Sequence, residues 1–226
     1  MADANQVVIA GRDEAKLDRA RAQGPALRSL RLDVTSEQQA RHAIDWLSSE
    51  LGGLDLLVNN AGVMHRQALS TSGAATGTAE EVDVNLAGAV RMTRLALPLL
   101  RAAPQAGLLF MSSAVALTAV PGLAVYAATL AALHSLARSL RAELADTQIR
   151  VFEVLPPVVE NDLEQGLEVP KIPPSAIVDA IVAGVERDRE EIPVGRVKQL
   201  VPLARIWPRL ADRIVLRALG GFGGAG

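Results

Sequence analysis

Short apolar runs alternate with helical patterns along most of the chain. Apolar runs of strand length occur at residues 6–10, 27–32, 54–58, 108–111, 149–155 and 192–194. The segments between them predict helices at residues 13–22, 35–51, 79–100, 126–144 and 175–187, with an amphipathic segment at 198–219. Strands that are apolar on both faces are typical of a parallel sheet with helices on both sides. The pattern therefore predicts a doubly wound α/β fold.

Polar residues and turn residues stand directly after several of these runs. They are Gly11-Arg12, Asp33-Val34, Asn59-Asn60-Ala61-Gly62, Ser112-Ser113 and Pro156-Pro157. In parallel sheets ligands bind outside the carboxyl ends of the strands, so these positions are candidates for a site. Tyr126, the only tyrosine of the chain, follows Ser113 by thirteen residues, and Asn85 lies inside the helix at 79–100.

In their order and spacing these residues resemble the short-chain dehydrogenase/reductase family, from residue 6 to about residue 165. The resemblance implies a catalytic role for Tyr126, Ser113 and Asn85, in which Ser113 polarises a carbonyl and Tyr126 is the general acid or base. It implies a Rossmann-like fold with NADP(H) as cofactor and a carbonyl or alcohol as substrate. The cofactor contacts that it implies are Arg12, Asp33, Val34, Asn60, Ala61, Gly62 and Val159.

Single residues among these have other interpretations. Arg12 either binds the 2′-phosphate of NADP, because Gly11 replaces the acid of NAD-preferring relatives, or is a solvated arginine at a helix start. Asp33 is either an adenine contact or a charge at a helix N-terminus. Asn85 either has a positional role, holding a water, or is a buried side chain that bonds the backbone.

The position four residues after Tyr126 departs from the family. A hydroxyl pair can hold a carbonyl oxygen and pass it a proton. An unassisted phenol has a pKa near 10, so a tyrosine in acid/base work needs a neighbouring cation. The family has a lysine one helical turn after the tyrosine, but this chain has Leu130, and the next basic residues on the helix are His134 and Arg138. The sequence therefore predicts impaired hydride transfer.

The family also opens with a strand, a glycine-rich turn and a helix whose N-terminus receives the pyrophosphate. Here residues 2–6 resemble the end of that helix, so roughly 20 to 30 residues of the family pattern are absent. We expect a sheet without its first strand, in which either unusual neighbours pair or two strand edges stay open.

Glycines elsewhere do not replace that turn. Residues 221–226 match G-x-G-x-x-G in letters but follow a helix and precede nothing, so we expect a flexible tail at 220–226. Gly73 and Gly77 are weaker phosphate candidates in a loop. We expect one domain over residues 1–226, with a helical, substrate-side segment at 168–219.

Composition excludes several classes of function. A net charge of −2 without a lysine or arginine run argues against nucleic-acid binding. No apolar stretch approaches the roughly 18 residues of a membrane span, and the first residues resemble no secretory leader, so a cytoplasmic protein is expected. The chain has no cysteine, and its three histidines have no carboxylate at ligand spacing, which predicts no metal site. His65 is either a loop residue or part of a substrate mouth.

Two helical segments suggest partners. The helix at 126–144 is apolar on more than one face, which favours a homodimer or homotetramer. Arg205, Arg209, Arg213 and Arg217 recur every four residues in the C-terminal segment. Packing on the domain or on a subunit is the favoured interpretation of that segment, so no membrane partner is expected, and a membrane-surface helix is the alternative.

Three functions follow. The first is NADP(H)-linked carbonyl or alcohol oxidoreduction with Tyr126 as proton donor. The second is non-redox chemistry by Ser113 and Tyr126 on the same scaffold. The third is a redox-silent binding or assembly subunit.

Overall fold

Parallel strand pairing organises the computed structural model, which describes residues 5–66, 68–70, 77–160 and 170–218. One sheet pairs β1 (Val8–Gly11) with β2 (Arg28–Arg31). The other has the order β3 (Leu56–Asn59), β4 (Ala106–Met111), β5 (Ile149–Leu155), β6 (Glu191–Pro193). All these pairings are parallel, which confirms the α/β expectation.

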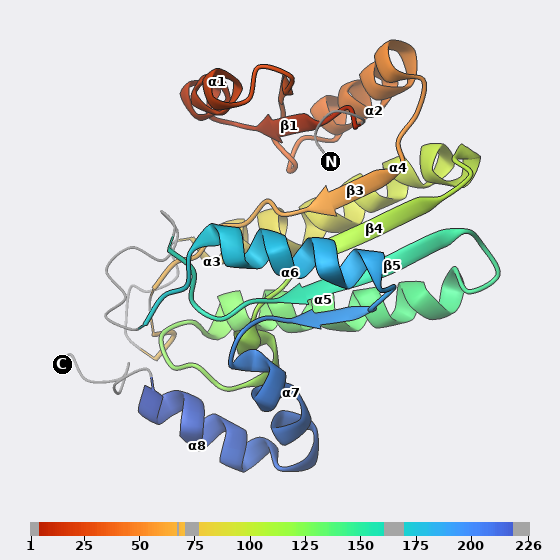
Figure 1. Cartoon of the computed structure of the whole chain (residues 1–226). Coiled ribbons are helices and arrows are strands. Elements are labelled where there is room, and N and C mark those ends of the chain that lie inside the picture. The colour runs from red at the N-terminus through yellow and green to blue at the C-terminus, as the bar shows by residue number, and fades with distance from the viewer. Residues whose placement is uncertain (1–4, 67, 71–76, 161–169, 219–226) are drawn as a thin grey trace.

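Helices cover both faces of the four-stranded sheet (Figure 1). Leu108 and Phe110 of β4 belong to the core shared with α4 (Ala89–Ala102) and α5 (Ala124–Glu143). Leu109, between them in sequence, packs with Ile177 of α6 (Pro174–Glu186) on the opposite face. Alternate side chains of a strand point to opposite faces, so an all-apolar strand needs both layers.

The two-stranded sheet carries α1 (Glu14–Gln23) and α2 (Glu37–Leu51). Ala40 and Ala43 of α2 belong to the same core as Met92 and Ala96 of α4, so α2 joins this part to the larger sheet. Ser36 caps the N-terminus of α2, since its Oγ accepts a hydrogen bond from the backbone N–H of Gln39 at 3.3 Å. The helix thus starts with a side-chain cap, two residues after the predicted start at Thr35.

The facing edges of β1 and β3 remain unpaired. No strand pairing among the described residues joins the two sheets, so the second of the expected outcomes, open edges, is the one observed. Leu56 and Val58 of β3 are accordingly 42 % and 46 % exposed, which is unusual for residues next to a buried strand such as β4.

The predicted helix at 79–100 has three parts. It consists of α3 (Thr78–Glu81), a π-helical segment η1 (Val82–Gly88) and α4. The wider turn contains Asn85, which is buried. Such π segments are frequent at functional sites. A 3₁₀ turn, η2 (Ala114–Leu117), which the apolar pattern does not indicate, follows Ser113.

The predicted C-terminal amphipathic segment forms two helices, α7 (Val197–Ile206) and α8 (Pro208–Ala218). Pro208 explains the break, because proline cannot donate the backbone hydrogen bond that a continuous helix needs. Among the residues described, no helix is both long and apolar enough to cross a membrane. The predicted glycine-rich tail at 220–226 and Gly73 lie outside the described residues.

Candidate active site

A pocket of about 340 Å³ lies where the chain leaves β3, β4 and β5. Of the ten catalytic and cofactor-binding residues that the resemblance implies, seven line it: Asn60, Ala61, Gly62, Asn85, Ser113, Tyr126 and Val159. They come from loops after three neighbouring strands, from η1 and from the start of α5. The parallel sheet brings them together because its strands all end on the same side.

Ser113 follows β4 and is buried at the pocket wall. Its Oγ donates to the carbonyl of Pro156 at 3.5 Å and accepts from the backbone N–H of Val115 at 3.4 Å. The first contact reaches the end of β5 and the second caps η2. Both bonds are long, so the hydroxyl is oriented without being tightly held.

Tyr126 stands in the first turn of α5, with 8 % of its surface exposed. The Thr129 hydroxyl donates to the Tyr126 carbonyl at 2.7 Å, and Thr129 Oγ1 accepts from Asn85 Nδ2 at 3.2 Å. The turn that carries the phenol is thereby fastened to η1.

The Asn85 side chain bonds the backbone of the loop after β3. Its Oδ1 accepts from the Val63 N–H at 2.8 Å and its Nδ2 donates to the Val63 carbonyl at 2.9 Å. The amide therefore has protein partners on both its oxygen and its nitrogen. Of the two interpretations offered by the sequence, this geometry corresponds to backbone bonding, and its consequence is positional, since it fixes the loop that begins with Asn60 beside Tyr126.

Leu130 lines the pocket one turn after Tyr126 and is buried. Its backbone carbonyl accepts a hydrogen bond from Ser112 Oγ at 3.4 Å, and its side chain belongs to the main core. None of the described pocket-lining residues is a lysine, arginine or histidine. The local environment of the phenol is therefore apolar at the position where the resemblance implies a cation.

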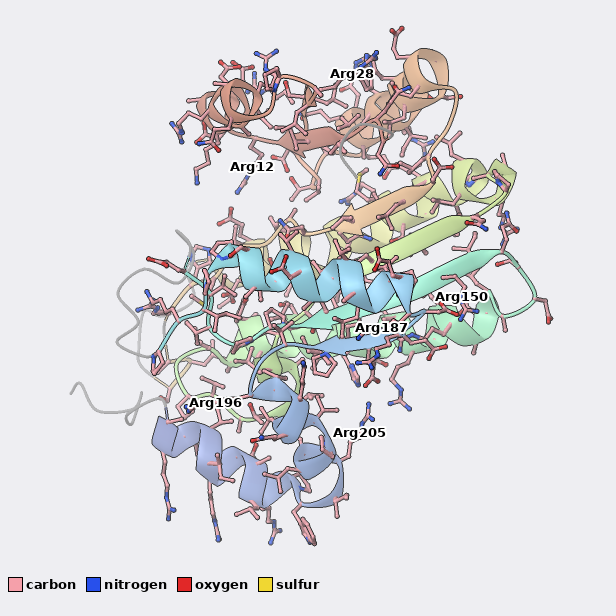
Figure 2. The ribbon with its side chains drawn as sticks, viewed as in Figure 1. Arg12, Arg28, Arg150, Arg187, Arg196 and Arg205 are labelled. Atoms are coloured by element: carbon pink, nitrogen blue, oxygen red, sulfur yellow. The ribbon has the colours of Figure 1, made fainter. Side chains whose placement is uncertain are left out.

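Arg12, Asp33 and Val34 do not line this pocket. Arg12 Nη1 lies 3.3 Å from Glu80 Oε1, and Glu80 Oε2 lies 3.1 Å from His65 Nε2. Figure 2 shows Arg12 on the part of the molecule that carries β1. The arginine predicted to meet a 2′-phosphate is thus engaged by a carboxylate from α3.

The carboxylate of Asp33 is held by its own turn. Asp33 Oδ1 accepts from the hydroxyl of Thr35 at 2.7 Å and from its N–H at 2.9 Å, and these bonds hold the pKa of Asp33 below its usual value. Val34 approaches Gly88 so closely that a Cβ there would lie 2.7 Å from Val34 Cγ2. Both residues therefore have structural partners of their own.

One wall of the pocket comes from α6, which lies inside the segment at 168–219 that is expected on the substrate side. Ile177, Val178 and Ile181 of α6 line it. The apolar pattern of this helix was visible in the sequence, but nothing there indicates which of its faces meets the pocket.

A second group that the sequence analysis missed surrounds His134. Its Nδ1 lies 2.7 Å from Oε2 of Glu153, and Glu191 completes a group whose potential ligand atoms lie within 4.8 Å of one another. Glu153 is fully buried, and its Oε1 has no hydrogen-bond partner among the described residues. Sequence spacing does not indicate this group, because its carboxylates come from β5 and β6.

Comparison with known proteins gives a consistent result. The family model of short chain dehydrogenases matches residues 1–170. The chain is 32 % identical over 208 residues to the uncharacterized oxidoreductase DltE of Bacillus subtilis, covering 87 % of this chain and 81 % of that protein.

Solved structures agree on the fold. A short chain dehydrogenase from Burkholderia cenocepacia in complex with NADP has 26 % identity and a TM-score of 0.82, covering 93 % of this chain and 86 % of that one. An alcohol dehydrogenase from Thermococcus sibiricus, complexed with 5-hydroxy-NADP, has 21 % identity and a TM-score of 0.76, covering 85 % and 86 %, which supports the fold alone.

Proposed function

The chain belongs to the short-chain dehydrogenase family of oxidoreductases, and on this premise we propose that it transfers hydride between NADP(H) and a small-molecule carbonyl or alcohol, at a rate limited by Leu130. One observation carries the proposal: Ser113 and Tyr126 line the same pocket as Asn60, Gly62 and Val159. The hydroxyl pair and the predicted cofactor contacts thus share one space.

The hydroxyls act on the substrate oxygen. Ser113 donates a hydrogen bond to the carbonyl oxygen, and Tyr126 passes its phenolic proton to that oxygen as negative charge develops there. Thr129 and Asn85 keep the turn bearing Tyr126 in place. Apolar side chains from α5 and α6 limit the access of water to the reacting oxygen.

The residues present fit the nicotinamide end of the cofactor better than its 2′-phosphate end. Asn60, Ala61, Gly62 and Val159 would hold the nicotinamide end, and bound NADPH would supply the hydride. Arg12 would meet the 2′-phosphate only after leaving Glu80. The NADP-bound relative from Burkholderia cenocepacia supports NADP(H) as the cofactor.

Leu130 affects carbonyl reduction and alcohol oxidation unequally. Without a neighbouring cation a phenol stays protonated at neutral pH, the form that donates during carbonyl reduction. Alcohol oxidation needs the phenolate, which only about one molecule in a thousand would carry at pH 7. The reductive direction is therefore the one to assay first.

The test has two stages. NADPH binding is followed by cofactor fluorescence, and a panel of carbonyl compounds is then assayed for turnover. Tyr126→Phe and Ser113→Ala are expected to lower kcat/KM by about 10²–10⁴-fold. Ser135→Ala, an exposed serine on the same helix, is the matched control and should leave turnover unchanged. Absence of NADPH binding up to millimolar cofactor would overturn the proposal.

The same assays separate the alternatives. Turnover without nicotinamide that is lost in Tyr126→Phe would assign non-redox chemistry to the hydroxyl pair. A homo-oligomer and a cytoplasmic location stay predictions. For the oligomer, support comes from exposed apolar residues on η1 and α4, where Val82 and Val90 are 43 % and 41 % exposed.

A further inference from the structure

The end of α7, Trp207 and α8 present apolar side chains to solvent. Ile206, Trp207, Leu210 and Ile214 are 64 %, 61 %, 45 % and 45 % exposed. Only Ala211 of α8 is fully covered. The favoured interpretation of this segment is packing on the domain. Val215 does pack against the main core, whereas Ile206, Trp207, Leu210 and Ile214 are exposed.

Arginines accompany these apolar residues. Arg209, Arg213 and Arg217 are exposed, and within the described part of the chain no carboxylate lies within ion-pair distance of any of them. Figure 2 shows nitrogen-tipped side chains extending from α8 away from the molecule. We call these three arginines, together with Ile206, Trp207, Leu210 and Ile214, the α8 face.

Two charged residues nearby do not belong to the α8 face. Arg205 binds both carboxylate oxygens of Glu191 at 2.6 Å. Asp212, the one acidic residue of α8, turns inward, where its Oδ1 accepts from the backbone N–H of Ala119 at 2.8 Å. The α8 face therefore combines cations with large apolar groups and carries no acid.

We propose that the α8 face binds the surface of an anionic lipid bilayer. Lipid phosphates match the unpaired guanidinium groups, and the apolar side chains enter the boundary between headgroups and acyl chains. Tryptophan is enriched at that boundary in membrane proteins. Charge complementarity selects the lipid surface, because a purely apolar partner would leave three desolvated arginines unpaired.

The helix has dimensions that suit such a surface. Its eleven residues span about 16 Å, so it lies in the plane of the interface and does not cross the bilayer. The bond from Ala119 to Asp212 ties α8 to the segment between Ser113 and Tyr126. Binding at the α8 face therefore holds the segment that carries both hydroxyls at the membrane.

Vesicle flotation of the full chain tests the charge part. We expect co-flotation with vesicles of equal parts phosphatidylglycerol and phosphatidylcholine, none with phosphatidylcholine alone, and progressive release by salt as screening increases. Converting Arg209, Arg213 and Arg217 to Gln should weaken partitioning on the order of 100-fold. A control that converts Arg19, Arg138 and Arg187 to Gln changes the net charge equally on other elements and should bind like the unmodified chain.

Tryptophan fluorescence tests insertion. The chain has two tryptophans, so Trp46→Phe leaves Trp207 as the only emitter. We expect its emission to shift to the blue on addition of the anionic vesicles. Trp207→Ser should lower partitioning by roughly tenfold, because the largest exposed apolar group is lost.

Three results would each overturn the proposal. They are failure of the unmodified chain to float with anionic vesicles, full retention of flotation by the three-arginine variant, and unchanged Trp207 emission. If light scattering instead shows self-association that buries Trp207 without lipid, the α8 face is an interface with a second copy. Should a variant fail to fold, the salt release and the Trp207 shift still decide.

Discussion

The two sheets of this molecule are held in different ways. Every residue of β4 from Ala106 to Phe110 is buried, and so are six of the seven residues of β5. No residue of β1 or β2 is fully buried. The pocket with the hydroxyl pair rests on the first kind of sheet, and the residues predicted to meet the rest of the nucleotide rest on the second. Substrate chemistry and cofactor binding are thus supported unequally.

The links across the two parts are partly polar. Glu37 of α2 binds Arg91 at 3.2 Å and Arg94 at 2.7 Å on α4, and an Arg91 guanidinium nitrogen donates to the Val34 carbonyl at 2.5 Å. The Arg94 pair is exposed, and exposed ion pairs are weak in water. We therefore expect the part with β1 to open at lower free energy than the part with β4.

The largest effect should come from truncating the buried sheet. Phe110→Ala removes a fully buried ring and should lower the free energy of unfolding by about 3–5 kcal/mol. Ile9→Ala in the half-buried β1 should cost only about 1 kcal/mol. Urea unfolding measures both. Equal costs would contradict the difference between the sheets.

Restoring a cation beside the phenol is the next test. Leu130→Lys should raise the rate of alcohol oxidation by at least about tenfold, since a neighbouring ammonium favours the phenolate that this direction needs. The control Leu130→Met keeps the site apolar and should leave turnover unchanged. Burying the new amine will lower stability, so both variants are compared at a temperature where circular dichroism shows them folded. An unchanged rate in a folded Leu130→Lys would indicate that the cofactor side limits turnover instead.

The nucleotide side can be tested at Glu80. Glu80→Gln removes the partner of Arg12 and should tighten NADPH binding by about two- to fivefold, which corresponds to an exposed ion pair. Glu14→Gln removes a comparable exposed pair with Arg31 and should not change NADPH binding. Isothermal titration gives the two affinities. Equal affinities in all three proteins would mean that Arg12 does not meet the cofactor.

The smallest expected effect is the pH-dependent contribution of Asp33 to the free energy of unfolding. Because the Thr35 bonds lower the pKa of Asp33 in the folded chain, the ionised carboxylate stabilises the fold above the unfolded value near 3.9. That contribution is lost as the pH falls through the lower folded pKa. Asp33→Asn should therefore cost less than about 1 kcal/mol at neutral pH and nothing at the acid end, which urea unfolding at several pH values will show. A difference that grows on acidification would have the wrong sign.

Sequence predicted those parts of the site that depend on strand ends. Ser113 and Asn60 follow apolar runs directly, and a parallel sheet brings such residues together whatever the loops do. Tyr126 lies in the first turn of a helix whose pattern is clear. These features are local, so a sequence pattern is enough to predict them.

The remaining features depend on contacts between distant residues. Arg12 meets Glu80 across 68 positions, and His134 meets Glu153 from a neighbouring strand. The π-helical turn around Asn85 was predicted as ordinary helix, because apolar periodicity does not reveal which carbonyl each N–H chooses. Side-chain partners and local hydrogen-bond register follow from tertiary packing, which no single segment encodes.

His65 and Gly77, which are distant in sequence, lie in contact. A Cβ at Gly77 would lie 2.7 Å from the His65 ring, so the two residues are in close contact. Gly77 has a φ of +96°. The backbone N–H of His65 donates to Glu81 Oε1 at 2.7 Å. Because these two ends are fixed to each other, the closure entropy of the intervening chain grows only by about 0.6 kcal/mol for each doubling of its length. New sequence inserted there would leave the strand ends that carry the site where they are.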